Sequence, residues 1–258
     1  MTAEPIEPGY NAVTIYFHGQ PGSPGELDLF GTRPKGWIAI DRAENRGPDG
    51  PTHFDALASE VRLRSGGRPA KLVGFSIGAY AALEVAARLP HLDLSLDLVS
   101  AAAPLSTGDY LDRMVGKPIF ALAAGYPRLF TMVGITQGIV ARHFARKLCQ
   151  SLFATARGGD AELFRDAAFR AAIESVLRSG LGRSSAGYRT EVAAFVQDWT
   201  PVLRRVPHPV KIWHGRCDNW SPPAMAETLA TLLPRAEAAN LLANCSHYST
   251  LREYLRAQ

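Results

Sequence analysis

Cysteine is scarce in this sequence. Three cysteines, Cys149, Cys217 and Cys245, occur among 258 residues, and none lies in a CxxC motif or at the spacing of a zinc site. An odd, low count disfavours a disulfide framework and is typical of a reducing compartment. The seven histidines also show no metal-ligand spacing. We therefore expect neither a metal nor another cofactor.

Dense runs of basic residues are absent as well. The formal net charge is +4, and arginine far outnumbers lysine. The excess of positive charge lies between residues 105 and 200. Without a concentrated basic run, a nucleic-acid partner is not expected. The charge does fit a mild attraction to anionic substrates or surfaces.

A targeting segment and a membrane span are not evident. Residues 1–10 are acidic and contain prolines, unlike the basic start and apolar stretch of a signal peptide. Segment 119–140 is apolar, but Pro127 and Arg128 interrupt it. We interpret this segment as a buried helix rather than a membrane span, and we expect a cytoplasmic protein.

What the chain does contain is an alternation of short apolar runs with helical stretches. Buried strands are expected at 11–17, 37–40, 71–75, 94–100, 209–213 and 236–242. Helices are expected at 51–65, 79–89, 224–233 and 248–256. Strands that alternate with helices imply right-handed crossovers and a parallel sheet.

Residues 105–199 break this alternation. They contain no convincing strand, and helical stretches are expected at 132–153, 161–178 and 190–199. Glycines at 158–159 and 180–187 are expected to separate these helices. The large apolar residues of the segment are expected to be mostly core: Phe120, Leu122, Phe130, Met132, Phe144 and Phe153.

The strongest chemical signal is Gly74-Phe75-Ser76-Ile77-Gly78, between an expected strand and an expected helix. It fits the G-x-S-x-G nucleophile elbow, a turn so tight that the serine is strained and exposed at the sheet edge. Glycines at 74 and 78 allow the close approach of strand and helix. Alone, the motif also fits an ordinary glycine-rich turn.

An activated serine needs a base and an orienting carboxylate. Asp218 follows the strand that ends at Trp213, and His247 follows the strand that ends near Leu242. Ligands bind at the carboxyl ends of parallel strands, so both residues fall at the expected edge. The order Ser76, Asp218, His247 is the one that the elbow fold uses. A turn carboxylate and a surface histidine remain the alternatives.

Four motifs together resemble the α/β-hydrolase superfamily over nearly the whole chain: HGQPGS at 18–23, GFSIG at 74–78, HGRCDNWSP at 214–222 and CSHYS at 245–249. The resemblance implies an α/β fold with a mostly parallel sheet of about six strands flanked by helices. Residues 1–104 and 201–258 would form the core domain and 105–200 a helical cap. Few residues precede the first strand, so the first hairpin of the family is expected to be missing.

The resemblance also implies roles for single residues. Ser76 would be the nucleophile, His247 the general base and then the general acid, and Asp218 the carboxylate that orients His247. The backbone N–H groups of Gln20 and Ile77 would form the oxyanion hole.

Three further positions, His18, Phe75 and Trp220, are candidates for substrate binding. His18 also fits a structural role in its own loop, which is the preferred interpretation.

These roles favour a serine hydrolase that cleaves a carboxylic ester or thioester of a small, partly hydrophobic substrate. An acyltransferase, lyase or cyclase on the same fold is one alternative, and a binding protein with an idle triad is another. The expected partner is a small molecule. A sheet edge left bare by the missing hairpin allows a homodimer.

Overall fold

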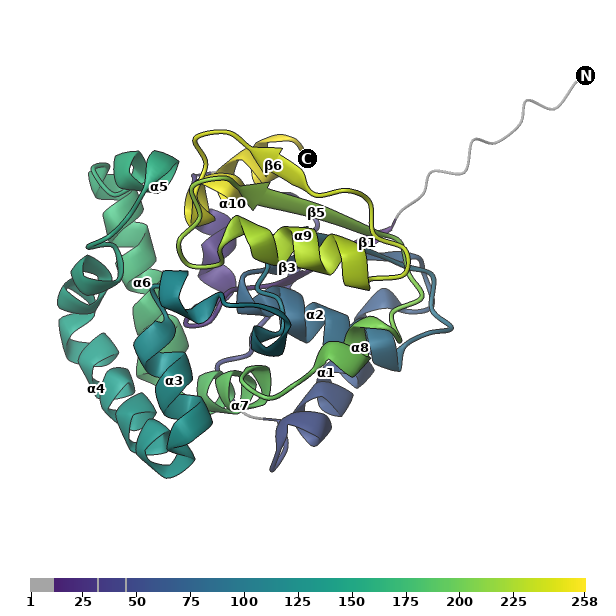
Figure 1. Cartoon of the computed structure of the whole chain (residues 1–258), viewed down its shortest axis with the longest axis horizontal. Coiled ribbons are helices and arrows are strands. Elements are labelled where there is room, and N and C mark those ends of the chain that lie inside the picture. Colours follow the sequence, from purple (N-terminus) through teal and green to yellow (C-terminus); the bar gives the residue numbers. More distant parts are fainter. Residues whose placement is uncertain (1–11, 32, 45) are drawn as a thin grey trace, which may run out of the picture.

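The computed structural model describes residues 12–31, 33–44 and 46–258, which form a six-stranded sheet (Figure 1). The strand order is β2-β1-β3-β4-β5-β6, and every neighbouring pair is parallel. The strands are β1 (Val13–Phe17), β2 (Ile38–Ile40), β3 (Ala70–Phe75), β4 (Leu94–Val99), β5 (Val210–Gly215) and β6 (Asn240–Leu242). The expected α/β class with about six strands is confirmed, although Asn11 lies outside the described residues.

The central strands are buried on both faces, which explains their nearly continuous apolar sequences. Alternate residues belong to two separate core clusters: Leu72 contributes to one and Val73 to the other. The first cluster packs under α1 (Gly50–Ser65), α2 (Ile77–Arg88) and α9 (Pro223–Leu232). The second packs under η1 (Pro24–Asp28) and α10 (His247–Arg256). The sheet therefore lies between two helical layers.

The chain between β4 and β5 is helical throughout, and Figure 1 shows α3 to α6 gathered beside the sheet. This segment contains η2 (Leu105–Thr107), η3 (Leu111–Arg113), α3 (Lys117–Gly125), α4 (Pro127–Leu152), α5 (Gly158–Leu163), α6 (Ala167–Arg183), α7 (Ala186–Phe195) and α8 (Thr200–Leu203). Among the described residues of this segment there is no strand, as the sequence predicts.

The expectation that glycines 180–187 separate two helices is wrong in part. Gly180 and Gly182 lie inside α6, and Gly187 lies inside α7. A Cβ at Gly180 would stand 2.0 Å from the carbonyl oxygen of Gly22. This glycine therefore allows α6 to pack directly on the loop after β1, instead of breaking the helix.

The expected burial of the apolar residues is also corrected at two positions. Phe120, Phe130 and Phe153 are buried, but Met132 is 65% exposed and Phe144 is 55% exposed. The reason is that α4 packs on α3, α6 and α7, while Met132 and Phe144 lie on its solvent-exposed side. The interpretation of segment 119–140 as a buried helix is therefore wrong for its outer side, where Met132, Ile135 and Ile139 are exposed. No described helix combines the length and apolar character that crossing a bilayer requires.

Candidate active site

The elbow places Ser76 at the start of α2 in a strained conformation, with φ of 56°. A Cβ at Gly74 would stand 2.5 Å from the Cα of Ala79, and one at Gly78 would stand 2.2 Å from the carbonyl oxygen of Phe17. Neither position accepts a side chain without moving backbone. The two glycines therefore allow the close approach of β1, β3 and α2 around Ser76.

Asp218 and His247 come together at the same sheet edge as an acid–base pair. His247 Nδ1 donates to Asp218 Oδ2 over 2.9 Å, and both side chains are buried. The other carboxylate oxygen accepts the backbone N–H groups of Trp220 (2.8 Å) and Ser221 (2.9 Å). Because Nδ1 carries the proton of this hydrogen bond, Nε2 is the nitrogen that can accept one.

The carboxyl group of Asp218 is held in its ionised form. Burial alone would raise its pKa, but the adjacent His247 and the hydrogen bonds lower the pKa below its usual value. A charged, buried carboxylate next to an imidazole stabilises that imidazole when it becomes protonated. The pair therefore suits proton transfer.

Two aromatic rings, those of Trp220 and Phe75, pack against the His247 ring. Trp220 stacks on it with ring centroids 5.4 Å apart, and Phe75 lies at 4.7 Å. Ser100, at the end of β4, donates through Oγ to the carbonyl oxygen of His247 over 3.1 Å. These contacts define the ring position before any substrate binds.

The backbone at His247 is fixed by a carboxylate from the helical segment. Asp160 of α5 accepts the N–H groups of Tyr248 (3.0 Å) and Ser249 (2.7 Å), the first turn of α10. Gly159 also donates to the carbonyl oxygen of Asn244 over 2.7 Å. The start of α5 is thus packed on the loop that carries His247.

A cavity of about 100 Å³ lies beside Ser76. Gln20, Ile77 and Trp220 line it together with Ser76, so the two residues expected to supply oxyanion donors border the same space as the candidate nucleophile. The helical segment supplies most of the remaining wall: Met114, Val115, Ile119, Phe120, Gln137, Leu148, Leu152, Leu181, Tyr188 and Val192. A larger open groove of about 750 Å³ over α1, α2 and α7 does not contain Ser76, so we place the site in the smaller cavity.

Ser76 Oγ makes no hydrogen bond to His247 among the described residues. Serine–histidine contacts are often long without substrate and tighten when it binds. His247 does not line the cavity beside Ser76, whereas Trp220, which stacks on the His247 ring, does.

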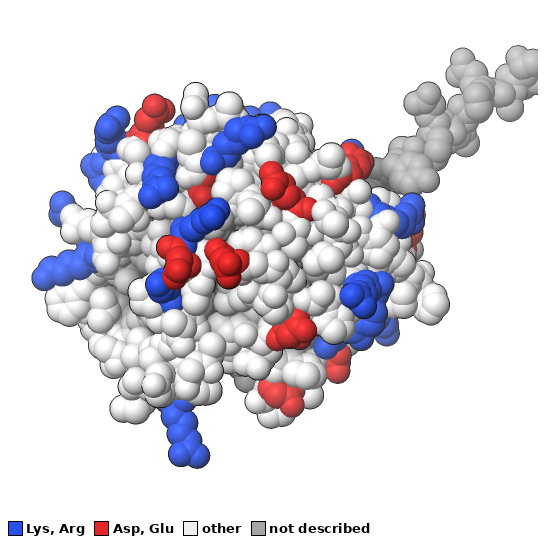
Figure 2. All heavy atoms as spheres, in the orientation of Figure 1, with Lys and Arg blue, Asp and Glu red and all other residues white. Residues whose placement is uncertain are grey.

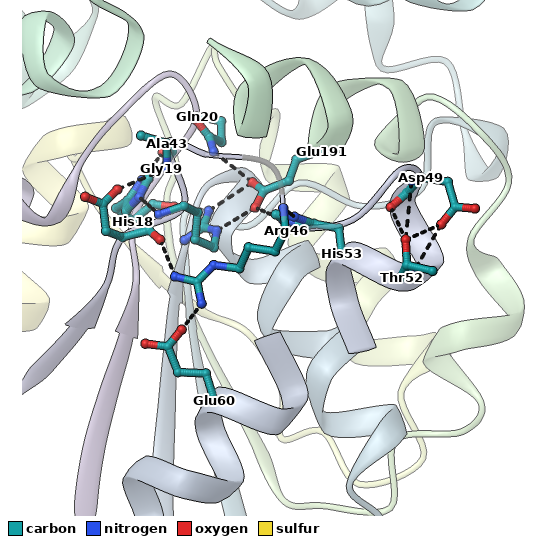
Figure 3. A network of polar contacts seen from close by, with 12 residues as sticks. His18, Gly19, Gln20, Ala43, Arg46, Asp49, Thr52, His53, Glu60 and Glu191 are labelled. Atoms are coloured by element: carbon teal, nitrogen blue, oxygen red, sulfur yellow. Dashed lines mark hydrogen bonds and ion pairs between the residues drawn. The ribbon is translucent and has the colours of Figure 1, made fainter. Parts of the chain in front are cut away.

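A buried ionic network holds the loop after β1 (Figure 3). Glu191 of α7 accepts from Gln20 Nε2 (2.9 Å) and from Arg42 Nε (2.7 Å), and its Oε1 lies 3.1 Å from His53 Nε2. Arg42 also donates to the carbonyl oxygen of His18 over 2.6 Å. The hydrogen bond to Glu191 thus ties the Gln20 side chain to α7.

The contacts within this network determine the protonation states of Glu191 and His18. Burial opposes ionisation of Glu191, but the Arg42 charge and the hydrogen bonds from His53 and Arg42 lower its pKa to about 2. Burial and the neighbouring Arg42 lower the pKa of His18 to about 3. His18 is therefore neutral, with Nδ1 donating to Gly19 O and Nε2 accepting the Arg42 N–H.

Two of the three residues proposed for substrate binding lie behind the cavity wall. His18 and Phe75 are completely buried, and neither lines the cavity beside Ser76. His18 ties its own loop, while Phe75 supports His247. Trp220 does line the cavity.

A second buried carboxyl group, Glu26 of η1, supports the same loop from the other side. Its Oε2 accepts the Gly19 N–H (2.8 Å) and the Tyr16 hydroxyl (3.0 Å), and its Oε1 has no hydrogen-bond partner in the described chain. Burial raises the pKa of Glu26 to about 7. No group of three metal-ligating side chains gathers anywhere in the described residues.

Sequence reasoning missed the supporting residues Glu26, Arg42, Asp160 and Glu191. Arg42 lies between an expected strand and an expected helix, and Glu191 lies in the expected helix 190–199, where each charge would ordinarily be solvated. Their partners lie far away along the chain, and no local sequence spacing indicates these contacts. A helix with a lone acid on its apolar face is the one signal that could have drawn attention to Glu191.

Comparison with known proteins supports the fold. No protein-family model matches the chain, and no curated protein matches its sequence. Among solved structures, MenH from S. aureus superposes with a TM-score of 0.65 at 15% identity, covering 98% of this chain and 93% of its own. The esterase EaEST from Exiguobacterium antarcticum gives 0.63 at 18% identity, with 96% and 93% covered.

A third similar structure is that of an alpha/beta hydrolase. MGS-M2, an alpha/beta hydrolase enzyme from a Medee basin deep-sea metagenome library, gives a TM-score of 0.59 at 18% identity and covers 99% of this chain and 92% of its own. These likenesses extend over almost the whole of each chain. The protein therefore has the α/β-hydrolase fold.

Proposed function

We propose that the protein is a serine hydrolase that cleaves a carboxylic ester or thioester through an acyl-enzyme on Ser76. The observation that carries the proposal is the buried His247–Asp218 hydrogen bond of 2.9 Å at the sheet edge where the elbow presents Ser76. The esterase-like structural neighbours support the same reaction class.

In the first step Ser76 Oγ attacks the acyl carbon while its proton passes to His247 Nε2. Asp218 keeps the imidazole in the required tautomer and stabilises the imidazolium. The C=O electron pair moves to the oxygen, which the backbone N–H groups of Ile77 and Gln20 would receive. Each such donor is typically worth about 3 kcal/mol of barrier lowering.

The tetrahedral intermediate then collapses. The bond from the acyl carbon to the leaving oxygen or sulfur breaks, and His247 returns its proton to that atom. Water next attacks the acyl-enzyme, His247 takes a proton from it, and the carboxylic acid leaves as Ser76 regains its proton. No other reactant is needed.

The cavity wall supports a substrate with a hydrophobic part. Apart from Gln137, the side chains that α3, α4 and α6 contribute to it are apolar, including Ile119, Phe120 and Leu148. We propose that residues 105–200 act as a cap that excludes water and selects the acyl or alcohol group. Ile119→Ala, which widens the cavity, would then shift the preferred acyl chain length upward, while Ile135→Ala on the outer surface of α4 would not.

The decisive experiment is labelling with a fluorophosphonate, which reacts with activated serines. The expected result is one adduct on the peptide that contains Ser76, lost in Ser76→Ala and kept in the matched variant Ser59→Ala, which alters a serine on the surface of α1. Unchanged labelling of Ser76→Ala, or no labelling of the native protein, would refute the assignment. Product analysis with an added alcohol acceptor then separates hydrolysis from acyl transfer.

A further inference from the structure

The outer surface of α4 carries an unusual row of exposed apolar side chains. Leu129, Met132, Ile135 and Ile139 are 48–65% exposed, and their spacing puts them on one face of the helix. Tyr126 precedes this row and Phe144 follows it, both more than half exposed. We call these six residues the outer α4 face.

Large apolar side chains are otherwise well covered in this protein. In the described residues, Leu63 is the one exposed large hydrophobic side chain outside the outer α4 face. Single exposed residues need no explanation, but a contiguous apolar row marks an interaction surface.

The charged residues of α4 itself are all basic. Between Asp112 and Asp160 the sequence has no acidic residue. Basic side chains stand at both ends of the row: Arg128 at its start, and Arg142, Arg146 and Lys147 at its end. In Figure 2 the surface over α3 and α4, at the lower left, is mostly uncharged, with Lys and Arg side chains at its margins.

This pattern disfavours a second copy of the chain as the occupant. A two-fold contact pairs α4 with itself. Whether the two helices run parallel or antiparallel, a basic end of one then meets a basic end of the other, and α4 supplies no carboxylate to compensate.

A lipid surface with anionic headgroups satisfies both features at once. Amphipathic helices with an apolar face and flanking Lys or Arg lie in the plane of such a surface, with the apolar side chains in the acyl boundary and the cations among the headgroups. Tyr126 and Phe144 are residue types suited to that boundary. Lys147 Nζ, 5.7 Å from the centre of the Phe144 ring, keeps a cation beside the apolar row.

We propose that the outer α4 face docks the protein on anionic lipid surfaces. On the same helix, Gln137, and Leu148 and Leu152 beyond the kink at Phe144, line the cavity beside Ser76. Docking would therefore place the cavity wall next to the lipid, and acyl compounds dissolved in that lipid are the substrates it would favour. This last step, unlike docking itself, rests on the proposed function.

Docking is tested by flotation of the full chain with vesicles of phosphatidylcholine, alone or with about one third phosphatidylserine. The Ser76→Ala protein is used beside the native one, so a failure of the catalytic assignment does not affect the result. We expect binding to the anionic vesicles that weakens with salt. Ile135→Ser/Ile139→Ser and Arg128→Glu/Arg146→Glu should each lower the partition coefficient roughly tenfold.

Matched controls sit on the surface of α1. Leu63→Ser and Arg62→Glu alter an exposed apolar and an exposed basic residue there, and should leave flotation unchanged. Equal binding to both vesicle types, no binding, or equal loss in the α1 controls would overturn the proposal. A dimer in analytical ultracentrifugation that Ile135→Ser/Ile139→Ser dissociates would also overturn it, in favour of self-association.

Discussion

Two buried glutamates support the loop after β1 from opposite sides, and their ionisation differs. Glu26 and Glu191 are both completely buried, yet the pKa of Glu26 is raised to about 7 and that of Glu191 is lowered to about 2. Glu26 accepts from neutral donors, the Tyr16 hydroxyl and the Gly19 N–H. Glu191 accepts from the Arg42 guanidinium at 2.7 Å.

The difference shows that burial alone does not decide the charge of a carboxyl group. Neutral hydrogen-bond donors leave Glu26 with most of its desolvation penalty, whereas the full charge of Arg42 outweighs that penalty at Glu191. One side of the loop is therefore held by a group that titrates near neutral pH, and the other by a permanent ion pair. Glu26 binds Gly19, and Glu191 binds Gln20, which lines the cavity beside Ser76.

The largest expected effect comes from breaking the ion pair. Glu191→Gln leaves the buried Arg42 charge without its counter-ion, and we expect the free energy of unfolding to fall by about 3–5 kcal/mol. The matched change Glu26→Gln removes no ion pair and should cost far less. Urea unfolding of both variants at neutral pH makes the comparison, and equal losses would contradict it.

The next largest effect is a change of the free energy of unfolding with pH that is caused by Glu26. Between its usual pKa of 4.5 and about 7 the folded protein keeps a proton that the unfolded chain releases, so unfolding becomes easier as pH rises. The contribution is about 3 kcal/mol across this window. Urea unfolding at a series of pH values should show this decline in the native protein.

Glu26→Gln should lack that decline, because an amide does not titrate. The contribution of Glu191 to stability has the opposite pH dependence. It is fully present above pH 4.5 and is lost as pH falls through about 2. A native pH profile that is flat between pH 5 and 7, or one that Glu26→Gln leaves unchanged, would show that Glu26 is ionised in the fold.

The smallest expected effect concerns Asp160, another buried carboxyl group. Burial raises the pKa of Asp160. Like Glu26, Asp160 accepts hydrogen bonds from backbone N–H and hydroxyl donors. These donors are the N–H groups of Tyr248 and Ser249 and the Ser249 hydroxyl, in the first turn of α10. Asp160→Ala should lower stability by about 1 kcal/mol, as loss of a helix cap does. It should also lower kcat more than it raises KM, because the start of α10 carries His247. Asp166→Ala, at the cap of α6, is the matched control and should leave kcat unchanged.

The sequence predicts the sheet and suggests the candidate catalytic residues because both depend on local signals. Strand–helix alternation fixes a parallel sheet, and in a parallel sheet residues that follow different strands meet at one edge. Ser76, Asp218 and His247 could be proposed in that way. The Arg42–Glu191 pair could not, because its partners lie 149 residues apart and neither has a local pattern.

Helix boundaries and exposure in residues 105–200 were harder to predict for similar reasons. Pro127 interrupts the apolar segment as the sequence indicates: α3 ends at Gly125, and Pro127 occupies the first turn of α4, where proline is well tolerated. Apolar spacing gave α4 an apolar face, but spacing cannot say whether another element covers that face. Gly180 suggested a break, although its function is to admit the backbone of Gly22.

The central claim, that Ser76 and His247 form one catalytic unit, is tested most directly by a double-mutant cycle on ester hydrolysis. The kcat/KM values of Ser76→Ala, His247→Ala and the double variant are compared with that of the native protein. We predict that each single change costs at least about a thousandfold and that the double variant is scarcely worse than either. Losses that multiply in the double variant, or a Ser76→Ala protein that keeps native turnover, would contradict the account.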